Sequence, residues 1–279
     1  MGSRIARRLL GADHELVVWN RTAEKADELV QLGAVRAESP ADAARGAEAV
    51  ITMLANPEAL RAVVEGADGL AAGSGDATVI EMSTVGPSAV IWLRSALPRE
   101  TPLVDAPVLG SLSEVESGSL RIFIGGPDEL AQRWMPLLSA LGEPIHVGPL
   151  GSGAAAKLVA NTTLLGTIGV LGEALALAQG LGLARDKAFE VLSATPIAAQ
   201  AERRREAVES GDYPARFSLS LARKDAELIA EAAAEAGVEL RIAEAARSWV
   251  AEAEEAGWGD RDYSAVLARI LSRRRAATS

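Results

Sequence analysis

The sequence predicts an α/β protein with a doubly wound sheet, followed by a domain made entirely of helices. Short apolar runs alternate with amphipathic segments over the first half of the chain. The run GPLGSG at 148–153 then marks a change of composition. After it the chain is rich in Ala, Leu and Glu and shows no convincing strand. We therefore expect one domain over residues 1–149 and a second over residues 150–279.

The first domain divides into strands at short continuous apolar runs and helices at amphipathic segments. The expected strands are 16–20, 49–54, 78–83, 102–107, 120–125 and 145–147. The expected helices are 2–10, 23–32, 41–45, 57–65, 87–97 and 129–140. Short connections between alternating strands and helices favour a parallel sheet.

Glycine-containing turns divide the second domain into helices. These turns are GLGL at 180–183, SGDYP at 210–214, AGV at 236–238 and AGWGD at 256–260. The longest uncharged stretch lies between Lys157 and Glu173 and has fifteen residues. A bilayer span needs roughly 18–20 residues, so we expect a buried helix and no membrane partner.

Charge and composition exclude several classes of function. The net charge of −10 argues against a nucleic-acid partner, and the basic run at 273–275 is interpreted as a solvated tail. The chain has no cysteine, which excludes disulfides, thiolate nucleophiles and cysteine-bound metals. His14 and His146 are isolated, so we expect structural roles for them and no metal site. Because three arginines interrupt the first ten residues, no signal peptide is visible, and we expect a cytoplasmic protein.

Gly2 opens an amphipathic segment that leads into the expected strand 16–20. This order is typical of the second half of a Rossmann-type dinucleotide-binding unit, where a glycine-rich turn lets the backbone approach the pyrophosphate. The first strand and the first two glycines of that unit are absent. A generic amphipathic helix followed by a strand explains this segment nearly as well.

The end of the expected strand 16–20 and the two residues after it indicate which dinucleotide binds. These residues are Asn20, Arg21 and Thr22. NAD enzymes place a carboxylate here to bind the ribose 2′-hydroxyl. An arginine instead can hold a 2′-phosphate with its planar fork of donors. We therefore expect NADP(H) as the cofactor, with NAD(H) as the weaker ligand. The alternative is that Arg21 is an ordinary exposed turn residue.

Nine segments in order extend this interpretation over nearly the whole chain. They are MGSRIARRLL, VVWNRT, ITML, EMSTVGP, DAPVLGS, SGSLRIFIGG, GSGAAAKLVANT, KDAEL and DYSAV. With them the chain resembles the β-hydroxyacid dehydrogenase family, which includes 3-hydroxyisobutyrate dehydrogenase and glyoxylate/succinic semialdehyde reductases. The resemblance implies that the chain moves hydride between a nicotinamide and a small β-hydroxy acid or aldehyde acid.

By this resemblance Lys157 and Asn161 are the catalytic residues. They are four residues apart in an expected helix, so they share one face of it. A lysine ammonium can donate a proton to the substrate oxygen as hydride arrives. Asn161 would orient that oxygen or Lys157 itself. Without the resemblance, Lys157 would be interpreted as a surface residue and Asn161 as an ordinary polar helix residue.

The resemblance also implies which further residues contact the cofactor. Met53 and Leu54 end the ITML run, and Thr84 follows the next strand, where the family contacts the nicotinamide. Thr84 can equally cap the helix that begins near Pro87. Lys224 matches the family lysine that reaches the cofactor from the helical domain. Its acidic neighbour Asp225 also allows a simple surface pair.

The segment Leu109, Gly110 and Ser111 matches the part of the family that holds the substrate carboxylate with backbone N–H groups. A glycine turn after a strand can do this without side-chain chemistry. Many family members have Ser where this chain has Leu109, so one hydroxyl is missing from the expected pocket.

The missing first strand would lie centrally in the family's sheet, between the strands expected at 16–20 and 49–54. Its absence leaves two strand edges without ladder partners, and each buried unpaired backbone group costs about 1–3 kcal/mol. By the resemblance we therefore expect roughly ten further upstream residues in the complete product.

Two other functions remain open. An imine reductase shares the fold, but its position equivalent to Lys157 usually carries Asp or Tyr. A non-catalytic nucleotide-binding relative is the second alternative, although it would have no reason to keep Lys157 and Asn161 in register. The apolar helices of the second domain and the resemblance together predict a homodimer or homotetramer.

Overall fold

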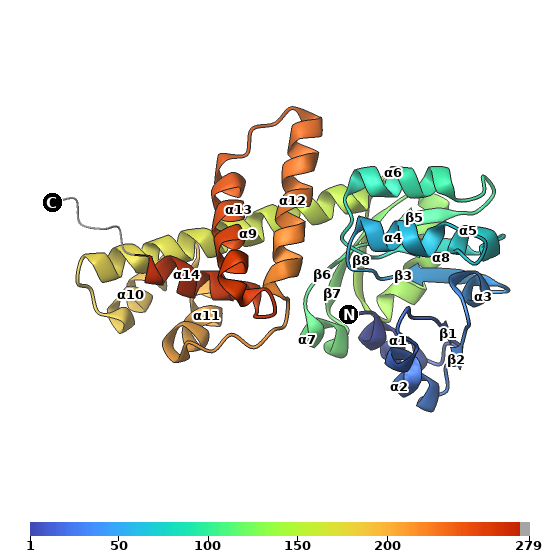
Figure 1. Ribbon diagram of the computed structural model, residues 1–279, viewed down its shortest axis with the longest axis horizontal. Helices are drawn as coiled ribbons and strands as arrows, with labels where there is room; N and C mark the ends of the chain where they lie inside the picture. Colours follow the sequence, from blue (N-terminus) through green and yellow to red (C-terminus); the bar gives the residue numbers. More distant parts are fainter. Residues whose placement is uncertain (274–279) are drawn as a thin grey trace. The chain divides into compact units, whose positions relative to one another are not determined.

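The computed structural model describes residues 1–273, and the chain forms two compact units. The first comprises Met1–Leu158, and the second begins at Val159 inside one long helix. Arg274 and Arg275 of the basic run lie outside the described residues. Figure 1 labels the α-helices of both units and most of the strands.

The first unit is built on a six-stranded sheet. Its strands are β3 (Ala49–Thr52), β4 (Thr78–Glu81), β5 (Leu103–Asp105), β6 (Val108–Leu109), β7 (Leu120–Gly125) and β8 (Gly142–Gly148). Their order is β3-β4-β5-β7-β6, and β8 also pairs with β7. Thr52 lies opposite Glu81 in the parallel pair of β3 and β4. This register places the carboxyl ends of β3 and β4 side by side.

The expectation of a parallel sheet is wrong at β7, which runs antiparallel to both β5 and β6. A parallel connection needs a crossover of about a dozen residues or more. Only two residues separate β5 from β6, and the connection from β6 to β7 contains just the short helix α7 (Leu112–Ser117). The chain therefore reverses direction here. β8 returns after α8 (Asp128–Ser139) and pairs parallel with β7.

Helices cover both faces of this sheet, as a doubly wound fold requires. On β4, Val79 packs with residues of α4 (Pro57–Val64), α5 (Leu70–Gly73) and α6 (Pro87–Ala96). The next residue, Ile80, packs with residues of α1 (Gly2–Leu10) and α8. Successive side chains of a strand point to opposite faces, so two separate cores form. Figure 1 shows α4, α5 and α6 on one side of β3 and α1 on the other.

A second, two-stranded sheet holds the segment that follows α1. Its strands β1 (Val17–Val18) and β2 (Val35–Arg36) pair in parallel. The elements near them are η1 (Ala23–Ala26), α2 (Asp27–Gln31) and α3 (Pro40–Ala44). Within the described residues β1 pairs only with β2, and β3 pairs only with β4. The break between the two sheets falls where the sequence predicts a strand position to be empty.

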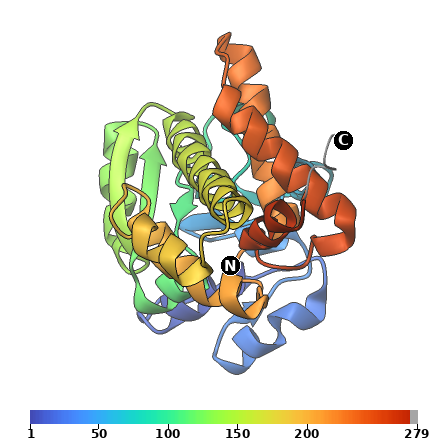
Figure 2. The same cartoon turned by 90° about the vertical axis from the view of Figure 1, so that its left-hand side faces the viewer.

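The regular elements in the described part of the second unit are all helices, apart from one isolated bridge between Ser218 and Asp262. Its elements are α9 (Ser152–Gly180, which starts in the first unit), α10 (Arg185–Leu192), α11 (Ala198–Ser210), α12 (Leu219–Ala236), α13 (Arg241–Ala253), η2 (Glu254–Trp258), η3 (Tyr263–Ala265) and α14 (Val266–Ser272). α9, α11 and α12 end at the predicted glycine turns. Gly211 and Gly237 take left-handed conformations there, with φ of 74° and 67°. Figure 2 shows α12 and α13 as an antiparallel pair.

Helix α9 is the one described helix long and apolar enough to cross a membrane by length and composition. It has 29 residues, and its most apolar window has a mean hydropathy of 1.4. Half of that window is buried inside the protein. The core helix of a soluble protein passes the same test, so this property alone assigns no membrane role to α9.

Candidate active site

The amino terminus of α1 has the features of an anion site. Its first turn contains no acidic residue, and Met1 gives it no side-chain cap. The first N–H groups of a helix have no partner inside the helix, and the helix dipole favours an anion there. A Cβ added at Gly2 would lie 3.6 Å from the Cβ of Met53, just after β3. Two predicted cofactor residues, Gly2 and Met53, are therefore neighbours.

The predicted ribose-binding residues form a tight turn after β1. The Oδ1 atom of Asn20 accepts a hydrogen bond of 2.9 Å from the backbone N–H of Thr22. This bond leaves Arg21 exposed at the tip of the turn. Among the described residues Arg21 has no carboxylate within ion-pair distance. A guanidinium in this position fits a phosphate monoester better than it fits a neutral hydroxyl.

The segments after β3 and β4 contain the predicted residues Leu54 and Thr84. The backbone N–H of Leu54 donates a 2.8 Å hydrogen bond to the Oγ of Ser83. Thr84 is half-buried beside this contact in the chain. In open α/β sheets, ligands bind beyond the carboxyl ends of the strands. These segments fit the nicotinamide half of a dinucleotide on that ground.

The predicted substrate segment at 109–111 forms the start of α7. Gly110 has φ of +140°, which only glycine adopts without strain. Ser111 caps α7 and donates hydrogen bonds from its backbone N–H (2.7 Å) and its hydroxyl (2.6 Å) to one carboxylate oxygen of Glu114. The Ser111 side-chain bond is the largest cause that lowers the pKa of Glu114 to about 2. A carboxylate of the protein thus already holds the donors that the sequence assigns to the substrate.

A buried aspartate fixes the start of the helix that carries Lys157. Asp105 ends β5 and is completely buried. Its carboxylate accepts hydrogen bonds from the backbone N–H groups of Gly151 (2.8 Å) and Ala154 (2.6 Å). Burial raises the pKa of Asp105, while these two bonds act in the opposite direction. Lys157 follows one turn later and is only 8% exposed.

In the second unit Asn161 lies in a buried polar cluster. Its Nδ2 donates a 2.6 Å hydrogen bond to the Oδ2 of Asp225 on α12, and both residues are almost fully buried. The Oδ1 of Asp225 forms an ion pair of 2.5 Å with the ammonium of Lys224. The structure therefore brings together the predicted residues Asn161 and Lys224. Lys157 lies four residues before Asn161 on α9, where helical geometry places both on one face.

The sequence predicts no role in the site for Asp105, Asp225 or Glu114, and the structure buries Asp225, which the sequence also allowed in a surface pair. Asp105 begins the DAPVLGS segment and Asp225 follows Lys224, so each stands inside a motif already singled out. Their burial, and the donors that they bind, could not be read from those motifs. Glu114 gave a weaker signal, because Ser111 and Glu114 have the spacing of a capping box.

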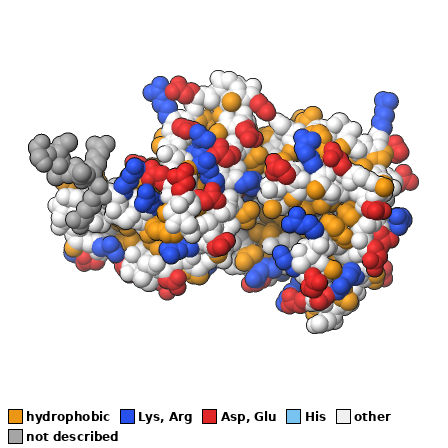
Figure 3. Space-filling model, viewed as in Figure 1, with side chains coloured by type: hydrophobic (Ala, Val, Ile, Leu, Met, Phe, Trp, Pro, Cys, Tyr) orange, Lys and Arg blue, Asp and Glu red, His pale blue; other side chains and the backbone are white. Residues whose placement is uncertain are grey.

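Other parts of the described chain offer weaker candidates. They contain no group of three or more His, Cys, Asp or Glu residues that could hold a metal. His146 has a structural contact, because its Nε2 lies 2.9 Å from the carbonyl oxygen of Gly126. On the face drawn in Figure 3, Lys and Arg side chains lie among Asp and Glu side chains, so no large field of one sign forms there.

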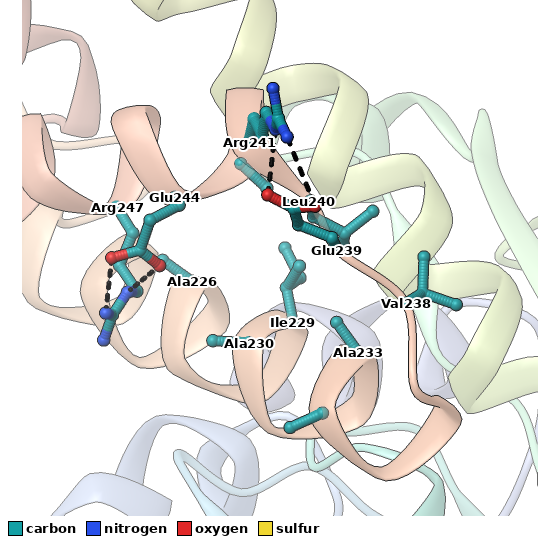
Figure 4. A pocket seen from close by; sticks show the side chains of 12 residues that line it. Ala226, Ile229, Ala230, Ala233, Val238, Glu239, Leu240, Arg241, Glu244 and Arg247 are labelled. Carbon is teal, nitrogen blue, oxygen red and sulfur yellow. Dashed lines mark hydrogen bonds and ion pairs between the residues drawn. The ribbon is translucent and has the colours of Figure 1, made fainter.

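A groove between α12 and α13 is lined by none of the predicted site residues. Small side chains such as Ala230 and Ala233 line one wall (Figure 4). The pair Arg241–Glu239 stands at its edge, with 2.8 Å between Nε and Oε1. Because the charges are paired, the groove has no unpaired polar group aimed into it that would point to a ligand.

Comparisons with known proteins identify the family of this chain. The family described as the NAD binding domain of 6-phosphogluconate dehydrogenase matches residues 1–151. The family described as NAD-binding of NADP-dependent 3-hydroxyisobutyrate dehydrogenase matches residues 151–270. The 3-sulfolactaldehyde reductase of Escherichia coli is 34% identical over 275 residues, which cover 97% of this chain and 92% of that protein.

Two further proteins extend the comparison. Glyoxylate/succinic semialdehyde reductase 1 of Arabidopsis thaliana is 31% identical, over 97% of this chain and 95% of the relative. The solved structure of Mycobacterium tuberculosis 3-hydroxyisobutyrate dehydrogenase with L-serine superposes with a TM-score of 0.84 at 26% identity. It covers 98% of this chain and 96% of the solved one.

The family models and these relatives together show an NAD(P)-dependent oxidoreductase that acts on hydroxy acids or aldehydes. The chain belongs to the β-hydroxyacid dehydrogenase family.

Proposed function

We propose that this protein uses NADP(H) to transfer hydride to a small aldehyde acid or from a small β-hydroxy acid. The observation that carries the proposal is the set of buried polar groups on α9 and α12. Lys157 is 8%, Asn161 2% and Asp225 3% exposed. Burying an amine, an amide and a carboxylate is unfavourable unless each is paired, so such residues are typical of functional sites.

The residues that fit the cofactor come from several elements of the first unit. The uncapped start of α1 suits the pyrophosphate, and Arg21 suits a 2′-phosphate. Met53, Leu54 and Thr84 suit the nicotinamide half. When bound, the reduced cofactor supplies hydride to the carbonyl carbon of the substrate.

In this proposal Lys157 supplies the proton. Its ammonium donates to the carbonyl oxygen when an aldehyde is reduced, and the neutral amine accepts that proton when an alcohol is oxidised. Asn161 accepts a hydrogen bond through its Oδ1 from the same substrate hydroxyl or from the lysine. Asp225 holds the amide of Asn161 in place.

The acid group of the substrate is assigned to the Ser111 donors, where it must compete with Glu114. Because Glu114 is ionised at neutral pH, a second carboxylate is repelled until Glu114 turns away. Substitution of Glu114 by glutamine removes that repulsion and keeps the side chain's size. The variant therefore distinguishes substrates with an acid group from substrates without one.

The experiment measures NADPH and NADH oxidation with succinic semialdehyde, with butanal as an uncharged aldehyde of the same length, and with a cyclic imine. We expect turnover of the aldehydes, and a lower KM for succinic semialdehyde alone in Glu114→Gln. Turnover of the imine alone would establish an imine reductase. Cofactor binding without turnover of any compound would establish a non-catalytic relative.

A further inference from the structure

A buried carboxylate joins the ends of two neighbouring strands in the first unit. Glu81 is the last residue of β4 and is completely buried. One of its oxygens, Oε1, accepts a 2.6 Å hydrogen bond from the backbone N–H of Ser83. The other, Oε2, accepts a hydrogen bond from the hydroxyl of Thr52 on β3. Glu81 therefore binds the segment that follows β4 through one oxygen and the end of β3 through the other.

A second link runs in parallel with the first. The hydroxyl of Ser83 accepts the 2.8 Å hydrogen bond from the backbone N–H of Leu54. Both links thus connect the segment 52–54 with the segment 81–83. The strand ladder itself ends with a 2.9 Å hydrogen bond from the backbone N–H of Met82 to the carbonyl oxygen of Thr52. The two side-chain links add to this backbone bond and extend the connection to Leu54 and Ser83.

A glutamate is unfavourable at this fully buried position if its side chain only contributes to packing. Burial raises the pKa of Glu81 to about 7, against the opposing effect of its bonds with Ser83 and Thr52. The carboxylate of Asp105 on β5 raises it further. Well-packed apolar residues of similar volume often stabilise a protein as much as a buried charged group does. The two bonds of Glu81 therefore need a reason beyond packing.

We propose that Glu81 is a positioning residue for the dinucleotide, since it holds the segments after β3 and β4 in one arrangement. The proposal rests on the cofactor binding described above. Met53 and Leu54 lie in the first segment, and Thr84 directly follows the second. If the two segments adopt the binding arrangement only part of the time, the apparent Kd rises by the inverse of that fraction.

The test compares two threonine substitutions at opposite ends of neighbouring strands. Thr52→Val removes the hydroxyl that Glu81 binds. Thr78→Val removes a buried hydroxyl at the other end of the pair, and this hydroxyl has no hydrogen-bond partner in the described chain. Titration calorimetry gives the Kd for NADPH and for NADH, and thermal unfolding gives Tm. We expect Thr52→Val to raise both Kd values several-fold and Thr78→Val to leave them unchanged.

Two substitutions of Glu81 complete the set. Glu81→Ala removes both acceptors and is expected to raise Kd about 10-fold or more, with kcat at saturating cofactor little changed. Glu81→Gln is expected to restore binding. Its amide oxygen accepts from Ser83, and its NH₂ donates to the Thr52 hydroxyl.

The outcomes separate the positioning role from the proposed function. If Thr52→Val leaves the Kd for NADPH and the Kd for NADH as unchanged as Thr78→Val does, Glu81 has no positioning role, whatever the effect on Tm. That result would overturn the inference. If Glu81→Ala does not fold, the threonine pair and Glu81→Gln still decide the matter. Absence of NADPH and NADH binding in the unsubstituted protein would overturn the cofactor assignment itself.

Discussion

The amide nitrogen of Asn161 donates a 2.6 Å hydrogen bond to the carboxylate of Asp225. This bond fixes the orientation of the amide and therefore which of its two polar atoms can bind another group. An ionised carboxylate only accepts hydrogen bonds, so the nitrogen must face it. The Oδ1 of Asn161 is buried and makes no hydrogen bond in the described part of the chain. Asn161 therefore offers an acceptor, and in the proposed reaction its partner would be a donor, such as an alcohol or an ammonium group.

The first prediction follows from that bond. Asp225→Ala frees the Asn161 amide to rotate, and we expect kcat/KM to fall about 10- to 100-fold, the effect of losing a buried partner worth about 1–3 kcal/mol. Asp225→Asn keeps an acceptor oxygen, so its kcat/KM should fall less than that of Asp225→Ala. In a double-mutant cycle, Asp225→Ala should add nothing once Asn161→Ala is present. Fully additive losses would mean that Asp225 acts through Lys224 instead, which the same cycle with Lys224→Ala measures.

The second prediction concerns the pH dependence of stability. The pKa of Glu81 is about 7 in the folded chain and near 4.5 when unfolded. Between these values the folded state keeps a proton that the unfolded state has lost, so stability falls as pH rises. This loss of folding free energy is complete above pH 7 and amounts to about 3 kcal/mol for the shift in the pKa of Glu81. Glu81→Gln cannot titrate and should lack this part of the slope.

Urea unfolding at several pH values between 4.5 and 8 measures the effect. Asp105 has a raised pKa as well and contributes a slope of the same sign to both proteins. The difference between the unsubstituted protein and Glu81→Gln isolates Glu81. Parallel curves over the whole range would show that Glu81 has an ordinary pKa in the folded chain.

The third prediction tests the choice of cofactor. Arg21→Asp replaces the exposed guanidinium with a carboxylate that repels a 2′-phosphate. We expect the ratio of kcat/KM for NADPH to that for NADH to fall about 10- to 100-fold. Arg99→Asp is the matched control, because Arg99 is an exposed residue in the turn before β5. A preference for NADH in the unsubstituted protein would remove the role assigned to Arg21.

The strands that could be predicted are those formed by short apolar runs bounded by turns. Strand 120–125 has the expected bounds, since Leu120, Ile122 and Ile124 are buried while Arg121 is exposed. Strands β2 and β6 could not be predicted, because each has only two residues and shows no period. The direction of β7 depends on the length of its connection rather than on its own sequence.

The candidate site also has features that the sequence predicts and features that it does not. Lys157, Asn161 and Lys224 stand in motifs that a sequence displays directly. The pairing of residues from different motifs is not displayed in this way, because the bond between Asn161 and Asp225 spans 64 positions and that between Thr52 and Glu81 spans 29. Strand register and helix packing bring these groups together. Neither is encoded in a local pattern of residues.

The fourth prediction concerns assembly through α9. Val159, Val170 and Leu177 lie on one face of this helix, at spacings of eleven and seven residues, and are 68%, 48% and 64% exposed. An apolar helix face of this kind is a common interface between two copies of a chain. Light scattering should give at least twice the chain mass of 29.0 kDa.

Charged substitutions test whether this face is the interface. The pair Val170→Glu and Leu177→Glu together should yield monomers. Val191→Glu places the same charge on an exposed apolar residue of α10 and should not change the mass. A monomer of the unsubstituted protein at micromolar concentration would contradict the prediction. Insertion into lipid vesicles would assign the face to a membrane instead.

The last prediction concerns the proton donor. Lys157→Ala should lower kcat by about 10²- to 10⁴-fold, the usual contribution of general acid–base catalysis. The Kd for NADPH should change little, since the residues that suit the phosphates are those of α1 and the turn at Arg21. Lys157→Arg keeps the positive charge but should restore little activity, because a guanidinium does not give up its proton. Lys187→Ala is the control, since Lys187 lies in an exposed pair with Glu190 and should leave kcat unchanged.

The measurement must report the chemical step. With NADPH deuterated at the transferred position, a kinetic isotope effect on kcat shows that hydride transfer limits the rate. Under that condition the slow step in Lys157→Ala also contains the missing proton transfer, so its rate should rise when a small exogenous amine is added. Arginine at this position blocks the space that such an amine would occupy, and Lys157→Arg should not be rescued. If Lys157→Ala retains most of its kcat while the isotope effect is expressed, the burial of Lys157 has a structural cause and another group supplies the proton.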